Sequence, residues 1–163
     1  MPSGPSIRVR AWRPVFDMTT APSHLKPAAA DTLAVWHDMV ARRDLANLAS
    51  IVHPNAVFRS PMAIHPYQPA AALILVLSTV IQVFEDFTYH RQLASDDGLN
   101  VVLEFSARVG DKQLKGIDLV RFDEDGKIVE FEVMVRPLSG LQALGAEMGA
   151  RLAAHMPAFK VKQ

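Results

Sequence analysis

Cysteine is absent from this 163-residue chain, and its two signs of charge cancel. Without cysteine, disulfide bonds, thiolate catalysis and cysteine-ligated zinc sites are excluded. Lys and Arg number 17, and Asp and Glu also number 17, so the formal net charge is zero. A neutral chain has no surplus of positive charge to attract a phosphate backbone or an anionic membrane. We therefore expect neither nucleic-acid binding nor membrane binding.

The chain also lacks a long hydrophobic run. Its longest apolar stretch, residues 69–84, is interrupted by Ser78, Thr79 and Gln82 and is too short to span a bilayer. The arginines near the N-terminus are not followed by an apolar segment of signal-peptide length. These features predict a cytoplasmic protein.

The length and the composition favour one globular domain with a single core, because half of the residues are hydrophobic and 21% are charged. Residues 1–30 hold five of the eleven prolines and are predicted to form an irregular leader, in which Met18 is an alternative start. We expect the domain itself over residues 31–137, followed by a C-terminal helix and tail over residues 138–163.

Helical spacing comes first along the domain, and strand alternation follows. A helix is expected from a cap at Asp31 or Thr32, a short second helix over 45–52 ending at His53-Pro54, and a third from Pro69. A short strand is expected over 56–60. Period-two alternation then predicts four strands, over residues 86–93, 99–109, 112–122 and 127–136. Helices followed by an antiparallel sheet make an α+β protein.

Asp118 interrupts an apolar strand face. Strand side chains alternate, so this carboxyl shares its face with apolar residues or glycine: Leu114, Gly116, Val120 and Phe122. A buried carboxylate needs a partner or a raised pKa, and perturbed carboxyls concentrate at functional sites. Two interpretations stay open, a ligand-facing acid or base and a structural carboxyl bonded to a neighbouring element.

Four segments resemble the SnoaL-like and ketosteroid isomerase-like branches of the nuclear transport factor 2-like superfamily: residues 35–45, 53–61, 116–122 and 125–131. The resemblance covers about residues 31–136. It implies a cone-shaped fold, with N-terminal helices packed on a curved mixed or antiparallel sheet and an extra C-terminal helix. The fold hosts enzymes, binding proteins and association modules, so function does not follow from it alone.

The steroid isomerase comparison assigns roles by position. Asp118 matches the protonated Asp of the isomerase oxyanion hole, whereas Trp36 stands where that hole has a Tyr. Ser60, just before Pro61, stands where the isomerase has its general-base Asp. A serine does not shuttle a proton at neutral pH without an activating base, so steroid isomerisation by the known mechanism is not expected.

Two other branches of the superfamily differ in how well they match this chain. Limonene epoxide hydrolases, which share the fold, place an Arg where this chain has Gly116, and the second carboxylate of their site has no counterpart here. A polyketide cyclase-like function requires only an acid or base Asp in an apolar cavity, and Asp118 satisfies this requirement.

The predicted site combines Asp118, as acid or base, with a set of pocket residues. A pocket of this kind is mostly apolar with a few fixed polar groups. The predicted ligand-binding residues are Trp36, Phe58, Ser60, Met62, His65, Tyr67, Val120, Phe131 and Val133. Tyr89 and His90 lie on opposite faces of one strand, and the alternation does not show which of them faces the cavity. No His pair has metal-ligand spacing, so neither a metal nor another cofactor is expected.

Two functions are therefore carried forward. The first is binding of a small, largely hydrophobic molecule, with proton transfer by Asp118 in an isomerisation, cyclisation or dehydration. The second is a non-catalytic binding or association module with a structural Asp118. Ile117, Leu119 and Met134 are expected among charged residues on the opposite sheet face, which predicts a homodimer through the sheet.

Overall fold

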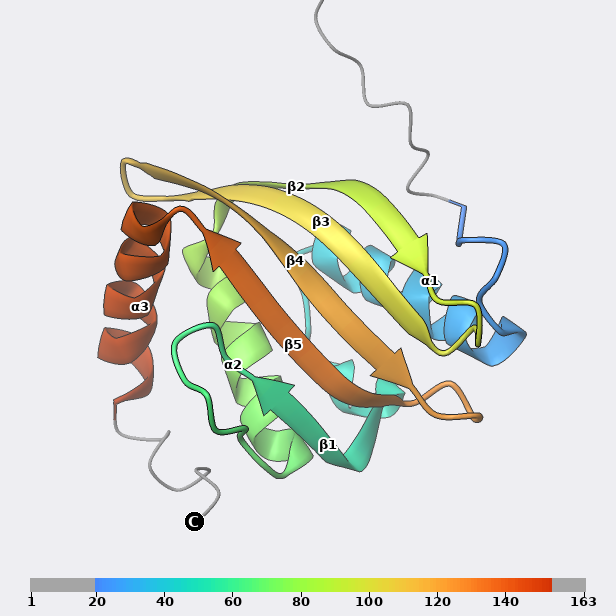
Figure 1. The fold of residues 1–163 in the computed structure, drawn as a ribbon. Coiled ribbons are helices and arrows are strands. Elements are labelled where there is room, and N and C mark those ends of the chain that lie inside the picture. Colours follow the sequence, from blue (N-terminus) through green and yellow to red (C-terminus); the bar gives the residue numbers. More distant parts are fainter. Residues whose placement is uncertain (1–19, 154–163) are drawn as a thin grey trace, which may run out of the picture.

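The computed structural model describes residues 20–153, which form one curved mixed sheet with helices against it. The sheet order is β1-β5-β4-β3-β2, in which β1 runs parallel to β5 and every other pair is antiparallel. Helices α1 and α2 lie behind the sheet, and α3 stands at one end of it (Figure 1). This open α+β arrangement confirms the predicted fold class.

The strands are β1 (Val52–Arg59), β2 (Glu85–Ala94), β3 (Asn100–Val109), β4 (Lys112–Phe122) and β5 (Ile128–Arg136). The helices are α1 (Pro27–Ala41), the short 3₁₀ helix η1 (Leu48–Ile51), α2 (Ala70–Val83) and α3 (Leu138–Leu152). The last four strands agree with the predicted ranges to within one residue. The alternative start at Met18 and the seventeen residues before it lie outside the described residues.

The predicted cap at Asp31 or Thr32 is wrong. Helix α1 begins at Pro27, with Lys26 as its extended N-cap residue, so the last residues of the predicted leader are helical. Proline suits the first turn, where its missing N–H has no helical partner to lose. The helix-forming alanines that follow extend the helix toward Asp31.

The predicted helix ending at His53-Pro54 is also wrong. Only Leu48–Ile51 is helical, and β1 starts at Val52 and runs through both residues. Proline is tolerated there because β1 is an edge strand whose register with β5 shifts between Val52 and Val57. The strand therefore begins earlier than the predicted residue 56.

The inner face of the sheet carries the core as predicted from the alternation. In β4 the whole face holding Asp118 is buried. In β3 all the residues that the alternation places on the apolar face are buried, namely Val101, Leu103, Phe105, Ala107 and Val109. Strict alternation over residues 127–136 also places Val129 on the apolar face of β5, and there the prediction is wrong. A bulge opposite Arg121 shifts the register, so Ile128 pairs with Phe122 and is buried in its place.

Gly116 makes room for the ring of Phe105, its partner on β3. A Cβ added to it would lie 2.5 Å from Phe105 Cζ and 2.5 Å from the Met134 carbonyl oxygen. The ring of Phe105 therefore occupies the space that a side chain at Gly116 would take. This packing explains why the strand face next to Asp118 has no Arg, which the epoxide hydrolase arrangement would need there.

No helix among residues 20–153 has the length and apolar character that crossing a bilayer requires.

Candidate functional site

Asp118 lies in the middle of β4, between Leu103 on β3 and Val133 on β5. Only 6% of the residue is exposed, and it is the only buried charged residue within the described part of the chain. The strand alternation that places Leu114 and Val120 in the core points this carboxyl inward as well. The sheet therefore holds one acidic group inside a hydrophobic layer.

Tyr89 on β2 donates a hydrogen bond from its hydroxyl to Asp118 Oδ2 at 2.7 Å. The same hydroxyl accepts a hydrogen bond from Trp36 Nε1 of α1 at 3.0 Å. A relay of three side chains therefore runs from the helix through the sheet to the carboxyl. It leaves the second oxygen, Oδ1, without a hydrogen bond among the described residues. No fully buried side-chain oxygen or nitrogen in that range lacks a partner, so Oδ1 is open to the cavity.

Aromatic packing fixes the relay in place. The Tyr89 ring meets Phe87 edge-on at 4.8 Å and His37 edge-on at 5.2 Å between ring centres. The Trp36 ring meets Phe131 edge-on at 5.3 Å. Edge-to-face pairs at these separations are favourable, and they leave each ring little freedom to turn. The hydroxyl of Tyr89 is therefore held toward Asp118 and not toward a ligand.

Burial dominates the electrostatics of the carboxyl. Removal from water raises the pKa of Asp118 to about 7, and the hydrogen bond from Tyr89 opposes that rise. Burial and the neighbouring carboxylate raise the pKa of Tyr89 well above its usual range, so the phenol stays protonated. Burial also lowers the pKa of His37, which keeps this nearby imidazole neutral near pH 7. Asp118 alone in this group changes charge near neutral pH.

A cavity of about 360 Å³ opens beside Asp118. Its floor is the sheet, its sides come from β1 and α2, and the residues of α3 close one end. Apart from Asp118, the lining offers only the hydroxyls of Ser60 and Tyr67 as polar side-chain groups. The lining residues are Phe58, Ser60, Pro61, Met62, Tyr67, Val76, Val80, Phe84, Asp118, Val133, Leu144, Gly145, Met148, Gly149, Leu152 and Ala153.

The loop between β1 and α2 folds back over the cavity. Phe58 and Tyr67 exchange two backbone hydrogen bonds, of 3.0 and 2.8 Å, which close the loop at its base. Their rings stack with 6.5 Å between centres. Within the loop, Ser60 Oγ accepts a hydrogen bond from the Met62 backbone N–H at 3.1 Å. The loop is therefore braced by its own backbone and presents Ser60 and Met62 to the cavity.

The structure brings together most of the residues predicted for the site. Phe58, Ser60, Met62, Tyr67 and Val133 line the cavity with Asp118. Three others, Trp36, Val120 and Phe131, are buried in the core and do not line it. His65 is exposed and lies outside the lining.

Sequence reasoning missed Tyr89 and the helical part of the lining. The alternation leaves open whether Tyr89 or His90 faces inward, yet a tyrosine on an inward strand face needs a polar partner for its hydroxyl. The carboxyl on the apolar face of β4 can accept a hydrogen bond from that hydroxyl, and this match is the signal that favours Tyr89. Nothing in the sequence marks the residues of α2 and α3 that line the cavity, because Val80, Leu144 and Met148 look like ordinary core residues.

Among residues 20–153, no group of three or more His, Asp or Glu side chains is arranged to hold a metal ion. What the described site offers is one titratable carboxyl, the hydroxyls of Ser60 and Tyr67, and an apolar enclosure. This combination suits binding of a largely hydrophobic molecule and transfer of a proton to or from it.

Comparison with known proteins agrees with this architecture. A profile of the SnoaL-like domain matches residues 33–131. The crystal structure of a steroid delta-isomerase from Pseudomonas aeruginosa is 65% identical, with a TM-score of 0.79, over 82% of this chain and 97% of that chain. No curated protein matches the chain.

Two further crystal structures share the fold. An uncharacterised protein with a cystatin-like fold from Silicibacter pomeroyi is 29% identical, with a TM-score of 0.72, over 82% of this chain and 90% of that chain. A putative SnoaL-like polyketide cyclase from Jannaschia sp. is 11% identical, with a TM-score of 0.61, over 78% and 98%. The domain match, the 65% relative and the cone-like sheet together show that this chain belongs to the SnoaL-like family of the nuclear transport factor 2-like superfamily.

Proposed function

We propose that this protein is an isomerase that moves a double bond in a small, largely hydrophobic carbonyl compound, with Asp118 as the proton-transfer group. One observation carries the proposal: a carboxyl with a pKa of about 7 lies at the wall of an apolar cavity. A general base works best when its pKa is near the operating pH, and burial is the usual means of raising a carboxyl to that value.

The reaction needs no co-reactant. The Asp118 carboxylate takes a proton from the carbon between the carbonyl and the double bond, and the electron pair of that C–H bond moves into a dienolate. The resulting carboxylic acid then gives the same proton to the far carbon of the former double bond. The dienolate collapses to the conjugated carbonyl compound, and Asp118 returns to its carboxylate form. Atoms and charge balance over the cycle.

Asp118 must carry out both proton transfers if the described residues supply the whole site. Its open oxygen, Oδ1, faces the cavity, whereas the lining contains no second carboxyl and no His. Ser60 supplies a hydroxyl that can donate a hydrogen bond to the dienolate oxygen. Tyr89 lies behind the carboxyl and acts as a positioning residue, because its hydroxyl is committed to Oδ2.

The 65% relative supports a steroid-like substrate, since that protein is described as a steroid delta-isomerase. The position of Ser60 still argues against a mechanism that uses a second carboxylate as the base. A route through one carboxyl reconciles the two observations. It makes a ketosteroid with an isolated double bond the first substrate to try.

The proposal is tested by incubating the purified protein with a β,γ-unsaturated ketosteroid and following the ultraviolet absorbance of the conjugated product. We expect turnover that rises with pH through about 7, as Asp118 ionises. Replacing Ser60 with Ala is expected to slow the reaction about tenfold and to leave the inflection of the pH profile in place. Tight binding of the steroid without any conversion would instead favour the non-catalytic binding module.

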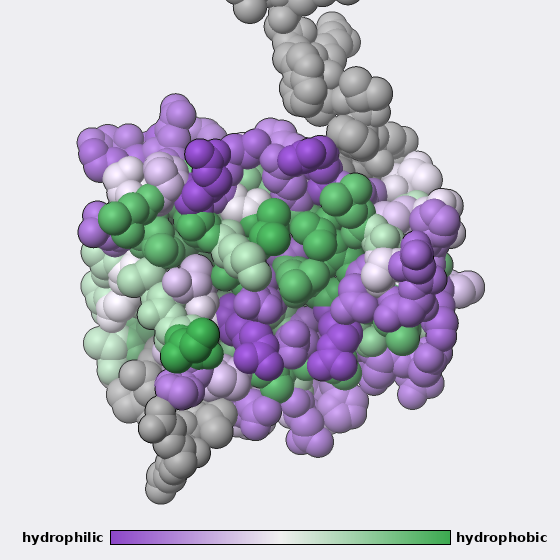
Figure 2. Space-filling model, viewed as in Figure 1, coloured by the Kyte–Doolittle hydropathy of each residue, from purple (hydrophilic) through white to green (hydrophobic). Residues whose placement is uncertain are grey.

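We further propose that the open sheet face pairs with a second copy of this chain. Figure 2 looks at this face and shows hydrophobic surface in its middle, bordered by hydrophilic residues. Leu93 and Met134 are 58% and 47% exposed there, beside Val102 and Ile117. Exposed apolar surface of this kind, rimmed by charges, marks association surfaces.

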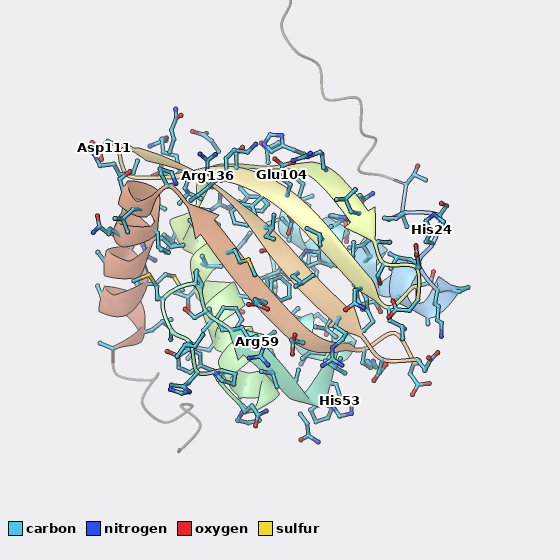
Figure 3. The ribbon with its side chains drawn as sticks, viewed as in Figure 1. His24, His53, Arg59, Glu104, Asp111 and Arg136 are labelled. Carbon is cyan, nitrogen blue, oxygen red and sulfur yellow. The ribbon has the colours of Figure 1, made fainter. Side chains whose placement is uncertain are left out.

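The charges on this face fit a two-fold pairing, which requires a surface that complements itself. Glu104 on β3 is already paired with Arg91 and Lys115. Arg136, labelled near the end of β5 in Figure 3, has no ion-pair partner among the described residues. Glu132 lies on the same face of β5 and is likewise unpaired within the described range. A two-fold axis across β5 would bring Arg136 of each copy toward Glu132 of the other.

Replacing Leu93 and Met134 together with Lys is expected to convert a dimer into a monomer, because two lysines on each copy would be buried against one another. Sedimentation velocity at tens of micromolar measures the change. The matched control is Leu138→Lys, which alters a leucine that is 68% exposed on α3. A monomeric wild-type protein would contradict the proposal.

A further inference from the structure

Met62 occupies an unusual position in the loop that covers the cavity. It is 56% exposed, yet it is also one of the residues that line the cavity, so its side chain spans the boundary between the interior and solvent. Its backbone is held by the hydrogen bond from its N–H to Ser60 Oγ and by the Phe58–Tyr67 pairing at the base of the loop. Only the unbranched side chain is free to adapt.

The side chain of Met62 is seated on Gly145 of α3. A Cβ added to Gly145 would lie 2.6 Å from Met62 Cε, too close to pack, and 3.0 Å from Met62 Sδ, a tight contact, so the flexible end of Met62 would have to shift. The thioether therefore fills the space that any larger residue at position 145 would take. This contact joins the loop after β1 to α3 across the end of the cavity.

Gly149, one helical turn further along α3, also lines the cavity but differs in its surroundings. A Cβ added there would meet no atom of residues 20–153 within 4 Å. The two glycines therefore have different relations to the loop, although both belong to the same helix and the same cavity wall. Among the described residues, the Met62–Gly145 contact joins the loop to α3 at this end of the cavity, and none of them fills the space beside Gly149.

We propose that Met62, seated on Gly145, is a specificity-determining residue that sets the length of hydrophobic molecule the cavity accepts. The inference rests on the proposed function in so far as the cavity receives a ligand, but it does not require that the ligand react. Methionine suits the role because its three rotatable bonds and polarizable sulfur adapt to the end of a bound molecule. The floor of the cavity is strand and cannot adapt in this way.

A series of linear primary alcohols, from hexanol to tetradecanol, serves as a ruler. Each alcohol displaces the neutral fluorescent probe N-phenyl-1-naphthylamine, and the decrease in fluorescence gives its dissociation constant. Affinity should increase about fourfold for each buried methylene, the fold-change that corresponds to about 0.8 kcal/mol. The increase should stop at the length where the chain reaches Met62.

In Met62→Ala we expect this break point to move about two to three carbons higher, because the atoms that close the cavity are gone. In Gly145→Ala the new methyl group displaces Met62, and we expect the longest alcohol accepted by the wild-type protein to bind at least fivefold more weakly. Ser139→Ala is the matched control, since it raises the helix propensity of an exposed position on α3 that does not line the cavity, and should change affinity less than twofold. In the Met62→Ala background, Gly145→Ala should have no further effect.

An unchanged break point in Met62→Ala, or equal effects of Gly145→Ala and Ser139→Ala, would overturn the inference. So would failure of the wild-type protein to bind the probe. If the protein binds the series as expected but does not convert the ketosteroid, the proposed function fails while the role of Met62 stands. If the protein converts the ketosteroid but the break point does not move in Met62→Ala, the role of Met62 fails while the proposed function stands.

Discussion

Asp118→Asn is expected to remove the activity of the protein and, at the same time, to make it more stable at pH 8. Asparagine keeps the shape of the side chain and can still accept the hydrogen bond from Tyr89, but it cannot take up or release a proton near neutral pH. General acid–base catalysis by one group is worth about 10²–10⁴-fold. We therefore expect kcat/KM to fall by about a thousandfold in the ketosteroid assay.

The gain in stability follows from the direction of the pKa shift. Burial raises the pKa of Asp118 from 3.8 to about 7, so between these values the folded protein binds more protons than the unfolded chain. The contribution of Asp118 to the free energy of unfolding is therefore fully present below pH 3.8 and is lost as pH rises through about 7. The slope is about 1.4 kcal/mol per pH unit, which makes the cost above pH 7 about 4 kcal/mol. Asparagine removes this cost.

Thermal unfolding measured across pH 4–8 checks the result. The melting temperatures of the two proteins should be similar near pH 4 and should separate as pH rises, with the variant about 10 °C higher at pH 8. Asp111→Asn, a change of the same kind in a carboxylate whose side chain is 84% exposed, is the control and should show no such separation. Full activity in Asp118→Asn would exclude the acid–base role, and a lower melting temperature at pH 8 would exclude the raised pKa.

The opposing effects on activity and stability explain how far the sequence could reveal this site. A carboxyl on an otherwise apolar strand face costs stability unless it has a use, so the alternation in residues 112–122 was enough to single out Asp118. The same alternation predicted the buried faces of β3 and β4. Local pattern was informative wherever strands pair in regular register.

The errors lie where long-range structure overrides local pattern. A bulge between β4 and β5 exchanged Val129 for Ile128 in the core, and an edge position allowed a strand to pass through Pro54. Such features depend on the neighbouring strand and leave no mark in a single segment. The cavity wall from α2 and α3 was missed for a similar reason, because helix packing decides which of several apolar residues face a space.

The relay behind Asp118 shows a third kind of limit. Trp36 was compared with an oxyanion-hole Tyr, but its indole N–H donates to Tyr89 and does not reach the carboxyl. Tyr89 comes from a different strand, two positions away from β4 in the sheet order. Only the folded sheet shows that a phenol lies between the helix and the carboxyl. The chain has just two tyrosines, and they have separate tasks, one behind the carboxyl and one in the cavity wall.

Tyr89→Phe is therefore expected to shift the pH profile of the enzyme without removing its catalytic group. The hydroxyl of Tyr89 stabilises the charged form of Asp118, so its loss raises the pKa of that carboxyl further above its usual range. A hydrogen bond to a charged group is worth about 1.5–3 kcal/mol, which corresponds to a shift of one to two pH units. If ionised Asp118 is the base, the ascending limb of kcat/KM moves to higher pH by that amount.

Tyr67→Phe provides the control, because it removes the only other tyrosine hydroxyl in the chain and leaves Asp118 and its hydrogen bond unchanged. The ascending limb of kcat/KM against pH for Tyr67→Phe should coincide with that of the wild-type protein. Trp36→Phe should shift the limb in the same direction as Tyr89→Phe but less, since it removes the donor that polarises the phenol.

The shape of the profile also separates the two roles that a carboxyl of this pKa allows. A base produces activity that rises with pH, whereas an acid that must stay protonated produces activity that falls. Loss of the Tyr89 hydroxyl moves the inflection to higher pH in either case. The direction of the slope therefore shows whether Asp118 acts as an acid or as a base, and the displacement shows that Tyr89 acts on its pKa. An inflection that stays in place in Tyr89→Phe would show that the titrating group is not Asp118.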